Sequence, residues 1–313
     1  MKYGFGVDLG GTTVKLAFFE ESGKMLEKWE IPTNRENNGA NILPDIAGAI
    51  NGYLADKKIG KDQILGIGIG IPGAVYGAGL VDKCDNLGWR NVDVQTTLSQ
   101  ATGLPVCVGN DANVAALGEA WVGGGQGCEN MVLVTLGTGV GGGIIIGGRQ
   151  VSGVHGAGGE IGHMVLCPEE TAVCGCGKRG CVEQYCSATG IVRLAKERLV
   201  KTDDNSILRK ENLTCKAVFD CAAAGDEMAQ AVLEQVYDYM GRFLANICCV
   251  ADPEIIVLGG GVSRAGEPLL MGAQKAFQKY AYHACRSTRF ALAALGNDAG
   301  AWGCFKLVLD NFG

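Results

Sequence analysis

The segment YGFGVDLGGTTVKLAFF, residues 3–19, decides the fold class. Its apolar runs Tyr3–Leu9 and Val14–Phe19 are typical of strands, and the residues between them, Gly10, Gly11, Thr12 and Thr13, are typical of a tight turn. The same order of elements returns later in the chain, at Met131–Leu136, Gly137-Thr138-Gly139 and Val140–Ile146. Strand and helix patterns alternate after each copy. The repeat therefore predicts a duplicated α/β domain.

The composition indicates a globular protein. The 313 residues are 47% hydrophobic and 19% charged, which excludes a disordered chain. The 50 glycines follow no Gly-X-Y period, which excludes collagen. Their main cluster, within residues 123–162, and the smaller groups at residues 10–11, 175–180 and 259–261 are interpreted as sites where the backbone approaches phosphates and metal closely. The net charge of −6 and the lack of a basic run make nucleic acid an unfavoured partner.

Two long uncharged stretches, residues 64–81 and 131–148, are near the length of a membrane-spanning helix. Repeated glycines interrupt both, and residues 66–71 alternate with period two, so we expect buried strands. The N-terminus, MKYGFGVDLGG, has no apolar signal region. We therefore expect a cytoplasmic protein whose 14 cysteines stay reduced and are mostly small buried hydrophobic residues.

A third strand is expected near Met25–Ile31, and two long helices further on. The glycine-free stretch Ile191–Ala224 predicts helix, and a second helix is expected from Glu227 to Val250, before Pro253. No Pro- or Ser-rich linker separates the halves, so a boundary near residues 115–125 rests on the repeat alone.

The two glycine turns are candidate phosphate-binding sites. Backbone N–H groups of residues 10–13 can approach an anion closely, and Asp8 can hold Mg²⁺ through water, although the same residues also suit an ordinary hairpin. The turn at residues 137–140 repeats this pattern. A third set follows the strand expected at residues 254–258, namely Gly259, Gly260 and Gly261. Together they predict a nucleotide site, whereas a dinucleotide GxGxxG fingerprint fits poorly.

Asn110 and Asp111 follow the expected strand Val106–Val108 and precede a helical run, Val114–Trp121. An Asn or Asp at this place can simply cap the helix. A carboxylate at a strand end is also a suitable general base for a hydroxyl, and the neighbouring amide can hydrogen-bond a substrate. Both interpretations stay open at this point.

The densest cluster of metal-binding residue types consists of His163, Cys174, Cys176 and Cys181. One His and three Cys suit a closed tetrahedral zinc site of the structural type. Cys167 ranks below these cysteines as a ligand, and a disulfide or unliganded thiols are the alternatives. We expect the other two histidines, His155 and His283, to be surface or packing residues.

Glu160 and Glu183 flank the cysteine-rich loop. They can be solvated surface charges, or they can converge with His163 on one pocket. Carboxylates, an imidazole, Asn110 and Asp111, with no cationic anchor among them, suit a neutral polyol such as a sugar.

Three motifs carry a family resemblance: Asp8-Leu9-Gly10-Gly11-Thr12, Glu160-Ile-Gly-His163, and the stretch from Cys174 to Glu183. Together they resemble the ROK family (repressors, open reading frames, kinases), most of all its bacterial glucokinases. The resemblance covers essentially the whole chain. It implies an actin-like, hexokinase-type α/β fold with two RNase-H-like domains around a cleft, at 1–118 plus 300–313 and at 119–299, with the zinc loop at 163–181.

The resemblance also implies an activity: transfer of phosphate from MgATP to the 6-hydroxyl of glucose, with Asp111 as general base. Sugar would be bound by Asn110, Asp111, Glu160, His163 and Glu183. Nucleotide would be bound by Asp8, Gly10, Gly11, Thr12, Thr13, Gly137, Thr138, Gly139, Val140, Gly259, Gly260 and Gly261. Zinc would be structural, Mg²⁺ would accompany ATP, and a homodimer is expected. The alternatives are a kinase for N-acetylmannosamine, N-acetylglucosamine or fructose, and a sugar-sensing regulator without catalysis. A repressor of this family is disfavoured, because it would carry an additional helix-turn-helix domain. A metal hydrolase is also disfavoured, because a closed four-ligand zinc site has no open position for water.

Overall fold

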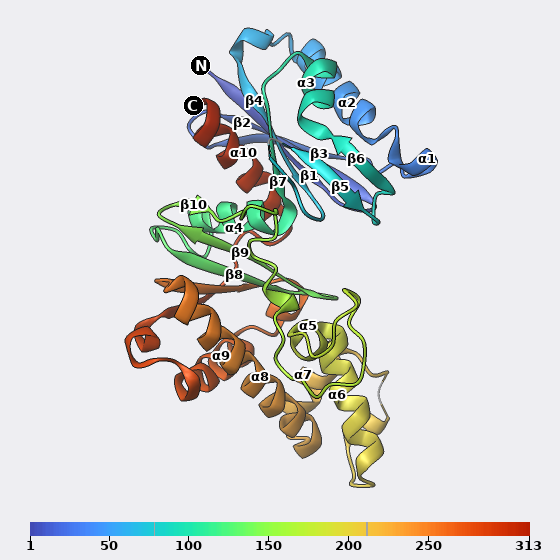
Figure 1. Cartoon of the computed structure of the whole chain (residues 1–313), viewed down its shortest axis with the longest axis vertical. Helices are drawn as coiled ribbons and strands as arrows, with labels where there is room; N and C mark the ends of the chain where they lie inside the picture. The colour runs from blue at the N-terminus through green and yellow to red at the C-terminus, as the bar shows by residue number, and fades with distance from the viewer. Residues whose placement is uncertain (78, 211) are drawn as a thin grey trace. The chain divides into compact units, whose positions relative to one another are not determined.

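The computed structural model describes residues 1–77, 79–210 and 212–313 (Figure 1). The chain divides into two compact units. The first comprises Met1–Gly127, Arg149–Gly159 and Asn297–Gly313, and the second comprises Cys128–Gly148 and Glu160–Gly296. These bounds differ from the predicted domains 1–118 plus 300–313 and 119–299. Helix α4 (Asp111–Val122) runs through residue 118 without a break, so its last turn stays with the first unit.

The main sheet of the first unit has the strand order β3-β2-β1-β4-β7. Its strands are β1 (Tyr3–Leu9), β2 (Thr13–Glu20), β3 (Met25–Pro32), β4 (Ile64–Ile71) and β7 (Val106–Asn110). The first three form antiparallel pairs, whereas β4 pairs parallel with both β1 and β7. A separate two-stranded sheet joins β5 (Leu80–Cys84) and β6 (Trp89–Asp93).

A second five-stranded sheet has the order β10-β9-β8-β11-β12. Its strands are β8 (Met131–Leu136), β9 (Val140–Ile146), β10 (Arg149–Gln150), β11 (Ile255–Gly259) and β12 (Arg289–Leu292). Strands β8 and β9 are antiparallel, and β11 pairs parallel with β8 and β12. Both sheets thus join an antiparallel hairpin to two parallel strands in the same order, which confirms the duplication predicted from the two hairpins.

Helix α10 packs directly on the first sheet because two glycines leave room for it. A Cβ at Gly68 would lie 1.9 Å from the carbonyl oxygen of Cys304, and one at Gly6 would lie 2.1 Å from that of Ala301. Neither glycine belongs to the clusters interpreted from the sequence as sites of phosphate or metal approach. Both serve helix packing, because the backbone of α10 occupies the space that a Cβ would need.

The first unit contains five α-helices among its described residues: α1 (Glu36–Gly39), α2 (Ile42–Lys57), α3 (Val94–Thr102), α4 and α10 (Ala299–Phe312). The second unit contains α5 (Glu183–Cys186), α6 (Ala188–Lys201), α7 (Cys215–Ala223), α8 (Glu227–Ala251) and α9 (Glu267–Tyr280). Short 3₁₀ turns occur at Lys61–Gln63, Ile161–His163, Ile207–Arg209, Gly261–Ala265, His283–Ser287 and Gly296–Asp298.

The two long helices predicted in the second unit have different outcomes. Helix α8 confirms the prediction of a helix from Glu227 to Val250. The single helix predicted at Ile191–Ala224 is wrong, because α6 ends at Lys201 and α7 begins only at Cys215. Short polar side chains follow α6, and such side chains compete with the helical backbone for hydrogen bonds.

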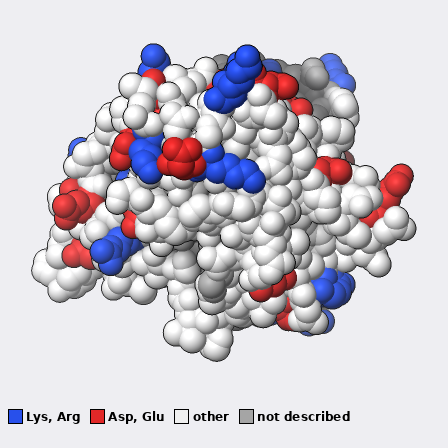
Figure 2. All heavy atoms as spheres, turned by 90° about the horizontal axis from the view of Figure 1, so that it is seen from above, with Lys and Arg blue, Asp and Glu red and all other residues white. Residues whose placement is uncertain are grey.

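The described residues of the two uncharged stretches form strands and turns, as predicted: β4 lies in the first stretch, and β8 and β9 lie in the second, while residue 78 of the first stretch is outside the described residues. In the described part of the chain, none of the helices has the length and apolar character needed to cross a membrane. Figure 2 shows one face of the molecule, on which positive and negative side chains lie in small groups separated by uncharged surface.

Candidate functional site

The carboxyl ends of β1, β4 and β7 form one edge of the first sheet, and three predicted site residues lie there. The strands are parallel neighbours, with Asp8 in register with Gly70 and Gly70 in register with Gly109. Asn110 and Asp111 follow Gly109 directly. Because neighbouring strands lie about 4.8 Å apart, Asp8 and the start of α4 are separated by roughly 10 Å along this edge.

The turn at residues 10–13 is closed by a hydrogen bond from the Gly10 amide to the Thr13 carbonyl oxygen, at 3.0 Å. Thr33, which follows β3, holds the turn from the side: its hydroxyl donates to the Gly10 carbonyl at 2.7 Å and its amide to the Thr12 carbonyl at 3.0 Å. A Cβ at Gly11 would meet no atom within 4 Å. The tip of the turn is therefore open. The supporting role of Thr33 was not predicted, and only strand pairing could have indicated it.

Asp8 lies beside a lysine that the sequence prediction did not include. The Lys15 ammonium is 3.5 Å from the Asp8 carboxylate and donates a 3.0 Å hydrogen bond to the carbonyl of Asn297. Burial raises the pKa of Asp8, and Lys15 opposes that rise. Behind the carboxylate lies the first turn of α10, where a Cβ at Gly300 would be 2.7 Å from the Asp8 Cγ.

Asn110 caps α4, as one of the two interpretations of this residue required. Its side-chain oxygen accepts from the Asn113 amide at 3.0 Å, and its Nδ2 donates to the Gly73 carbonyl at 3.0 Å. Asp111 is the first residue of the helix, and its Oδ1 accepts from the Ala112 amide at 2.8 Å. The positive end of the helix dipole stabilises a negative charge at this position.

The second sheet brings two of the predicted glycine sets to one edge. Strands β8 and β11 are parallel, so the turn at residues 137–140 and the set Gly259–Gly261 follow neighbouring carboxyl ends. Gly260 has φ = 81°, and a Cβ there would lie 2.5 Å from the Leu136 carbonyl oxygen. This close approach requires glycine.

The start of α6 holds the second turn. The Ala188 amide donates to the Gly137 carbonyl, and the Thr189 hydroxyl donates to the Thr138 carbonyl, both at 2.8 Å. Inside the turn, the Gly137 amide donates to the Gly139 carbonyl at 2.9 Å. The carbonyl oxygens of Gly137 and Thr138 are thus satisfied by α6, and that of Gly139 is satisfied within the turn.

His163, Cys174, Cys176 and Cys181 come together as predicted, and their ligand atoms all lie within 4.8 Å of one another. His163 Nδ1 is 3.9 Å from the Cys174 sulfur, and the sulfurs of Cys176 and Cys181 are 3.6 Å apart. In a tetrahedron with Zn–S bonds of about 2.3 Å, neighbouring sulfurs lie about 3.8 Å apart. The four residues therefore fit zinc in both chemistry and spacing.

The other residues considered as ligands lie outside this set. In the described residues, Cys167 is half-buried and is not a member of the four-residue cluster. His155 and His283 are exposed, and His283 contacts the ring of Tyr282 edge-on at 4.1 Å between centroids.

Glu160 and His163 lie at either end of one short 3₁₀ turn. The His163 Nε2 is 3.9 Å from the Glu160 carboxylate, too far for a direct hydrogen bond. The Glu160 side chain is 48% exposed and that of His163 is 32% exposed. With Nδ1 turned toward the thiols, the other ring nitrogen and the carboxylate can bind a polar ligand together.

Glu183 connects the cysteine-rich loop to the second turn. Its Oε2 accepts from the Val140 amide at 3.1 Å, and its Oε1 accepts from the Cys174 thiol at 3.6 Å. A Cβ at Gly139 would lie 2.2 Å from Oε2, so the turn admits this carboxylate only because residue 139 is glycine. Glu183 is therefore not a solvated surface charge.

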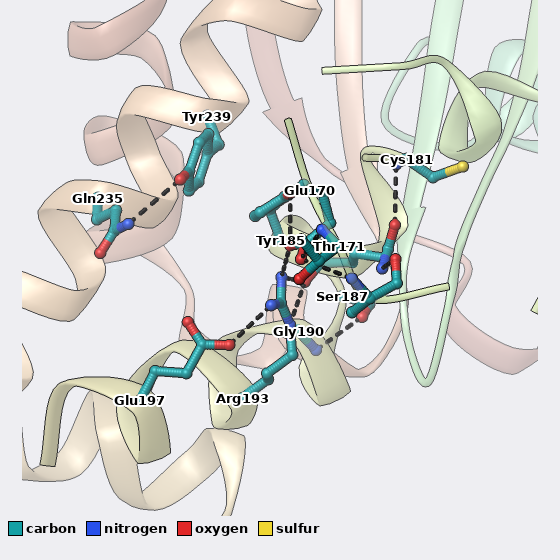
Figure 3. Close-up of polar contacts among 12 residues, drawn as sticks. Glu170, Thr171, Cys181, Tyr185, Ser187, Gly190, Arg193, Glu197, Gln235 and Tyr239 are labelled. Carbon is teal, nitrogen blue, oxygen red and sulfur yellow. Dashed lines mark hydrogen bonds and ion pairs between the residues drawn. The ribbon is translucent and has the colours of Figure 1, made fainter. Parts of the chain in front are cut away.

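A second set of contacts, which the sequence did not predict, fastens the same loop to α5 and α6 (Figure 3). The Glu170 carboxylate accepts from the Tyr185 hydroxyl at 2.7 Å and pairs with Arg193 at 3.0 Å. Backbone amides of Thr171 and Ala172 also donate to it. These donors and the nearby guanidinium lower the pKa of Glu170 to about 2.

Arg193 completes this set. Its Nη2 donates to the Gln184 carbonyl at 3.0 Å, its Nη1 pairs with Glu197 at 2.7 Å, and its guanidinium lies 5.1 Å from the centre of the Tyr185 ring. The loop is therefore held on one side by the ligand cluster and on the other by Glu170 and Arg193.

Comparison with known proteins gives the family. Residues 4–311 match the ROK family. A glucokinase of Halalkalibacterium halodurans is 44% identical over 97% of this chain and 94% of its own length. The chain therefore belongs to the ROK family, which confirms the resemblance seen in its motifs.

Solved structures give the fold. A ROK family glucokinase from Streptomyces griseus, in complex with glucose and AMPPNP, is 34% identical with a TM-score of 0.74, over 97% of this chain and 98% of that one. A ROK hexokinase from Thermus thermophilus is 30% identical with a TM-score of 0.80, over 99% and 100%. The predicted actin-like, hexokinase-type fold is confirmed.

Proposed function

We propose that this ROK-family chain is an ATP-dependent glucokinase, which transfers the terminal phosphoryl group of ATP to the 6-hydroxyl of glucose. The observation that carries the proposal is similarity to glucokinases over nearly the full length of the chain. Catalysis of such a transfer depends mainly on positioning and on neutralising the charge of the phosphates.

Asp111 is assigned as the general base. It would take the proton of the attacking hydroxyl, and the start of α4 holds its carboxylate in place through the Ala112 amide. Asn110 donates one N–H to the Gly73 carbonyl, and we assign its other N–H to a sugar hydroxyl.

The phosphates and the Mg²⁺ that accompanies ATP are assigned to Asp8 and to two turns, at residues 10–13 and 137–140. The open tip at Gly11 and the position of both turns, at the carboxyl edge of their sheets, support this assignment. Gly259–Gly261 is assigned to the adenosine side.

The remaining sugar contacts are assigned to Glu160, His163 and Glu183. Zinc would be held by His163, Cys174, Cys176 and Cys181, and when bound it supplies order rather than chemistry, since a closed site has no open position. A metal-bound thiolate has no proton to donate, which leaves Oε1 of Glu183 to accept from a sugar hydroxyl. His163 would donate from Nε2.

We also propose that the protein acts in the cytoplasm, where thiols stay reduced, because the 14 cysteines, which all lie among the described residues, form no disulfide there. The homodimer stays a prediction. The alternative functions are phosphorylation of another hexose and sugar sensing without catalysis.

An ADP-release assay across a hexose panel tests the proposal. Glucose is expected to give the highest kcat/KM, above N-acetylglucosamine, N-acetylmannosamine and fructose. A preference for an N-acetylated sugar would show that this sugar, and not glucose, is the substrate. If no sugar causes ADP release, the result favours a sugar-sensing regulator without catalysis.

A further inference from the structure

The proposed mechanism does not use Lys15, although this residue lies opposite Asp8 in the first hairpin. The two residues are register partners on β1 and β2, and such partners project from the same face of a sheet. The Lys15 ammonium is 3.5 Å from the Asp8 Oδ2. A hydrogen bond to the Asn297 carbonyl, at 3.0 Å, keeps the ammonium at this place.

Asp8 needs such a partner because its surroundings are poor in water. Its side chain is 21% exposed, whereas that of Lys15 is 31% exposed. The backbone of α10 closes one side of the carboxylate at Gly300. Taking a carboxylate out of water is costly unless a positive charge compensates it.

We propose that Lys15 is a positioning residue of the nucleotide site, which holds the Asp8 carboxylate in place and balances its charge so that the phosphates of a magnesium nucleotide are accepted at the turn of residues 10–13. The inference rests on the proposed kinase function. With Lys15 present, the Asp8–Lys15 pair carries no net charge. Without it, no side chain among the described residues would balance or hold the Asp8 carboxylate, and only the Mg²⁺ of the nucleotide would separate its charge from the anionic phosphates.

The test compares Lys15→Met with Lys28→Met. Lys28 lies on β3 of the same sheet and loses the same charge, but its partner is Asp298, at 2.7 Å, rather than Asp8. Binding of Mg²⁺-AMPPNP and of adenosine is measured for both variants by calorimetry, and turnover is measured with glucose. Adenosine has no phosphates, so it reports on structural damage alone.

Lys15→Met is expected to weaken AMPPNP binding by about 10-fold to 100-fold, the value of a lost charge-assisted hydrogen bond. Adenosine binding and the KM for glucose should change less than about twofold, kcat should fall, and Lys15→Arg should recover most of the loss. Lys28→Met should bind both ligands like the wild type.

Unchanged AMPPNP binding and turnover in Lys15→Met would overturn the proposal, as would an equal loss of adenosine binding. If Lys15→Met does not fold, Lys15→Arg and Lys15→Gln decide the matter, and equal AMPPNP affinity of the two contradicts a role for the charge. The binding experiment uses no sugar. A wild type that binds AMPPNP through Lys15 but phosphorylates no hexose would therefore contradict only the kinase function.

Discussion

The two hairpins that begin the two sheets have the same backbone plan and different side chains. In the first, Asp8 on β1 faces Lys15 on β2. In the second, the corresponding pair is Thr135 and Gly141, which carry no charge. The carboxylate beside the second turn is Glu183, which belongs to α5 and reaches the Val140 amide from 43 residues further along the chain.

The two turns therefore obtain their charged side chains from different parts of the chain. The charged pair of the first turn is fixed by the hairpin itself, whereas the carboxylate of the second turn depends on the loop that precedes α5. Duplication has thus preserved the frame of strands and turns, while each copy obtains its charged groups in its own way. Substitutions at the carboxyl edge of the first sheet should change catalysis, and substitutions in the cysteine-rich loop should change sugar binding and stability.

The largest effect on activity is expected for a substitution of Asp111, at the carboxyl edge of the first sheet. Asp111→Asn keeps the size of the side chain and its acceptor for the Ala112 amide but removes the base, so kcat should fall by about 10²-fold to 10⁴-fold while AMPPNP binding is kept. Steady-state kinetics and calorimetry check this. Asp93→Asn, at the N-cap of α3, is the matched control and should be near wild type. Near wild-type turnover of Asp111→Asn would exclude Asp111 as base.

The loop is tested most strongly at its metal ligands. Cys176→Ser, or chelation of the wild type, should lower stability by about 2 kcal/mol, or about 4–8 °C in Tm, because metal binding is coupled to folding. Affinity for glucose should fall in parallel. Thermal unfolding, metal analysis and sugar binding provide the readouts, with Cys249→Ser, an exposed thiol on α8, as control. Full stability and sugar affinity in a metal-free variant would refute a structural role for zinc.

Glu183→Gln tests the carboxylate that α5 places at the second turn. The substitution weakens the acceptor for the Val140 amide and for a sugar hydroxyl, so the KM for glucose should rise about 10-fold, with a smaller change in the KM for ATP. Michaelis constants for both substrates separate the two effects. A rise confined to the KM for ATP would show that Glu183 serves the turn only.

The smallest effect is expected where Glu170 and Arg193 fasten the loop. Because the pKa of Glu170 is lowered to about 2, its contribution is fully present above its unfolded-state pKa of 4.5 and is lost as the pH falls from there toward 2. Glu170→Gln should cost about 1–2 kcal/mol at pH 7 and less near pH 3. Unfolding at both pH values checks this, with the exposed Glu197→Gln as control. A cost that does not shrink at low pH would contradict the ionised pairing.

The sequence predicted the elements whose pattern is local. Alternating apolar residues around glycine turns predicted both hairpins, and the ligand spacing predicted the cluster of His163 with three cysteines. Lys15 could have been found from the register of the first hairpin, since a short turn places it opposite Asp8. The contacts Glu183–Val140 and Glu170–Arg193 could not have been predicted, because they depend on the path of an irregular loop that has no sequence periodicity. The packing of α10 on Gly6 and Gly68 could not be predicted either, because the strand pattern does not show which element covers a glycine.

Identifying the product tests the proposed glucokinase activity most directly. Wild-type protein, glucose and MgATP are followed by phosphorus NMR, and ADP is counted in parallel, with Asp111→Asn as the matched sample. We expect glucose 6-phosphate in a one-to-one ratio with ADP from the wild type, and almost none from the variant in the same time. ADP without a phosphorylated sugar, a phosphate on another hydroxyl, or equal yield from both proteins would contradict it.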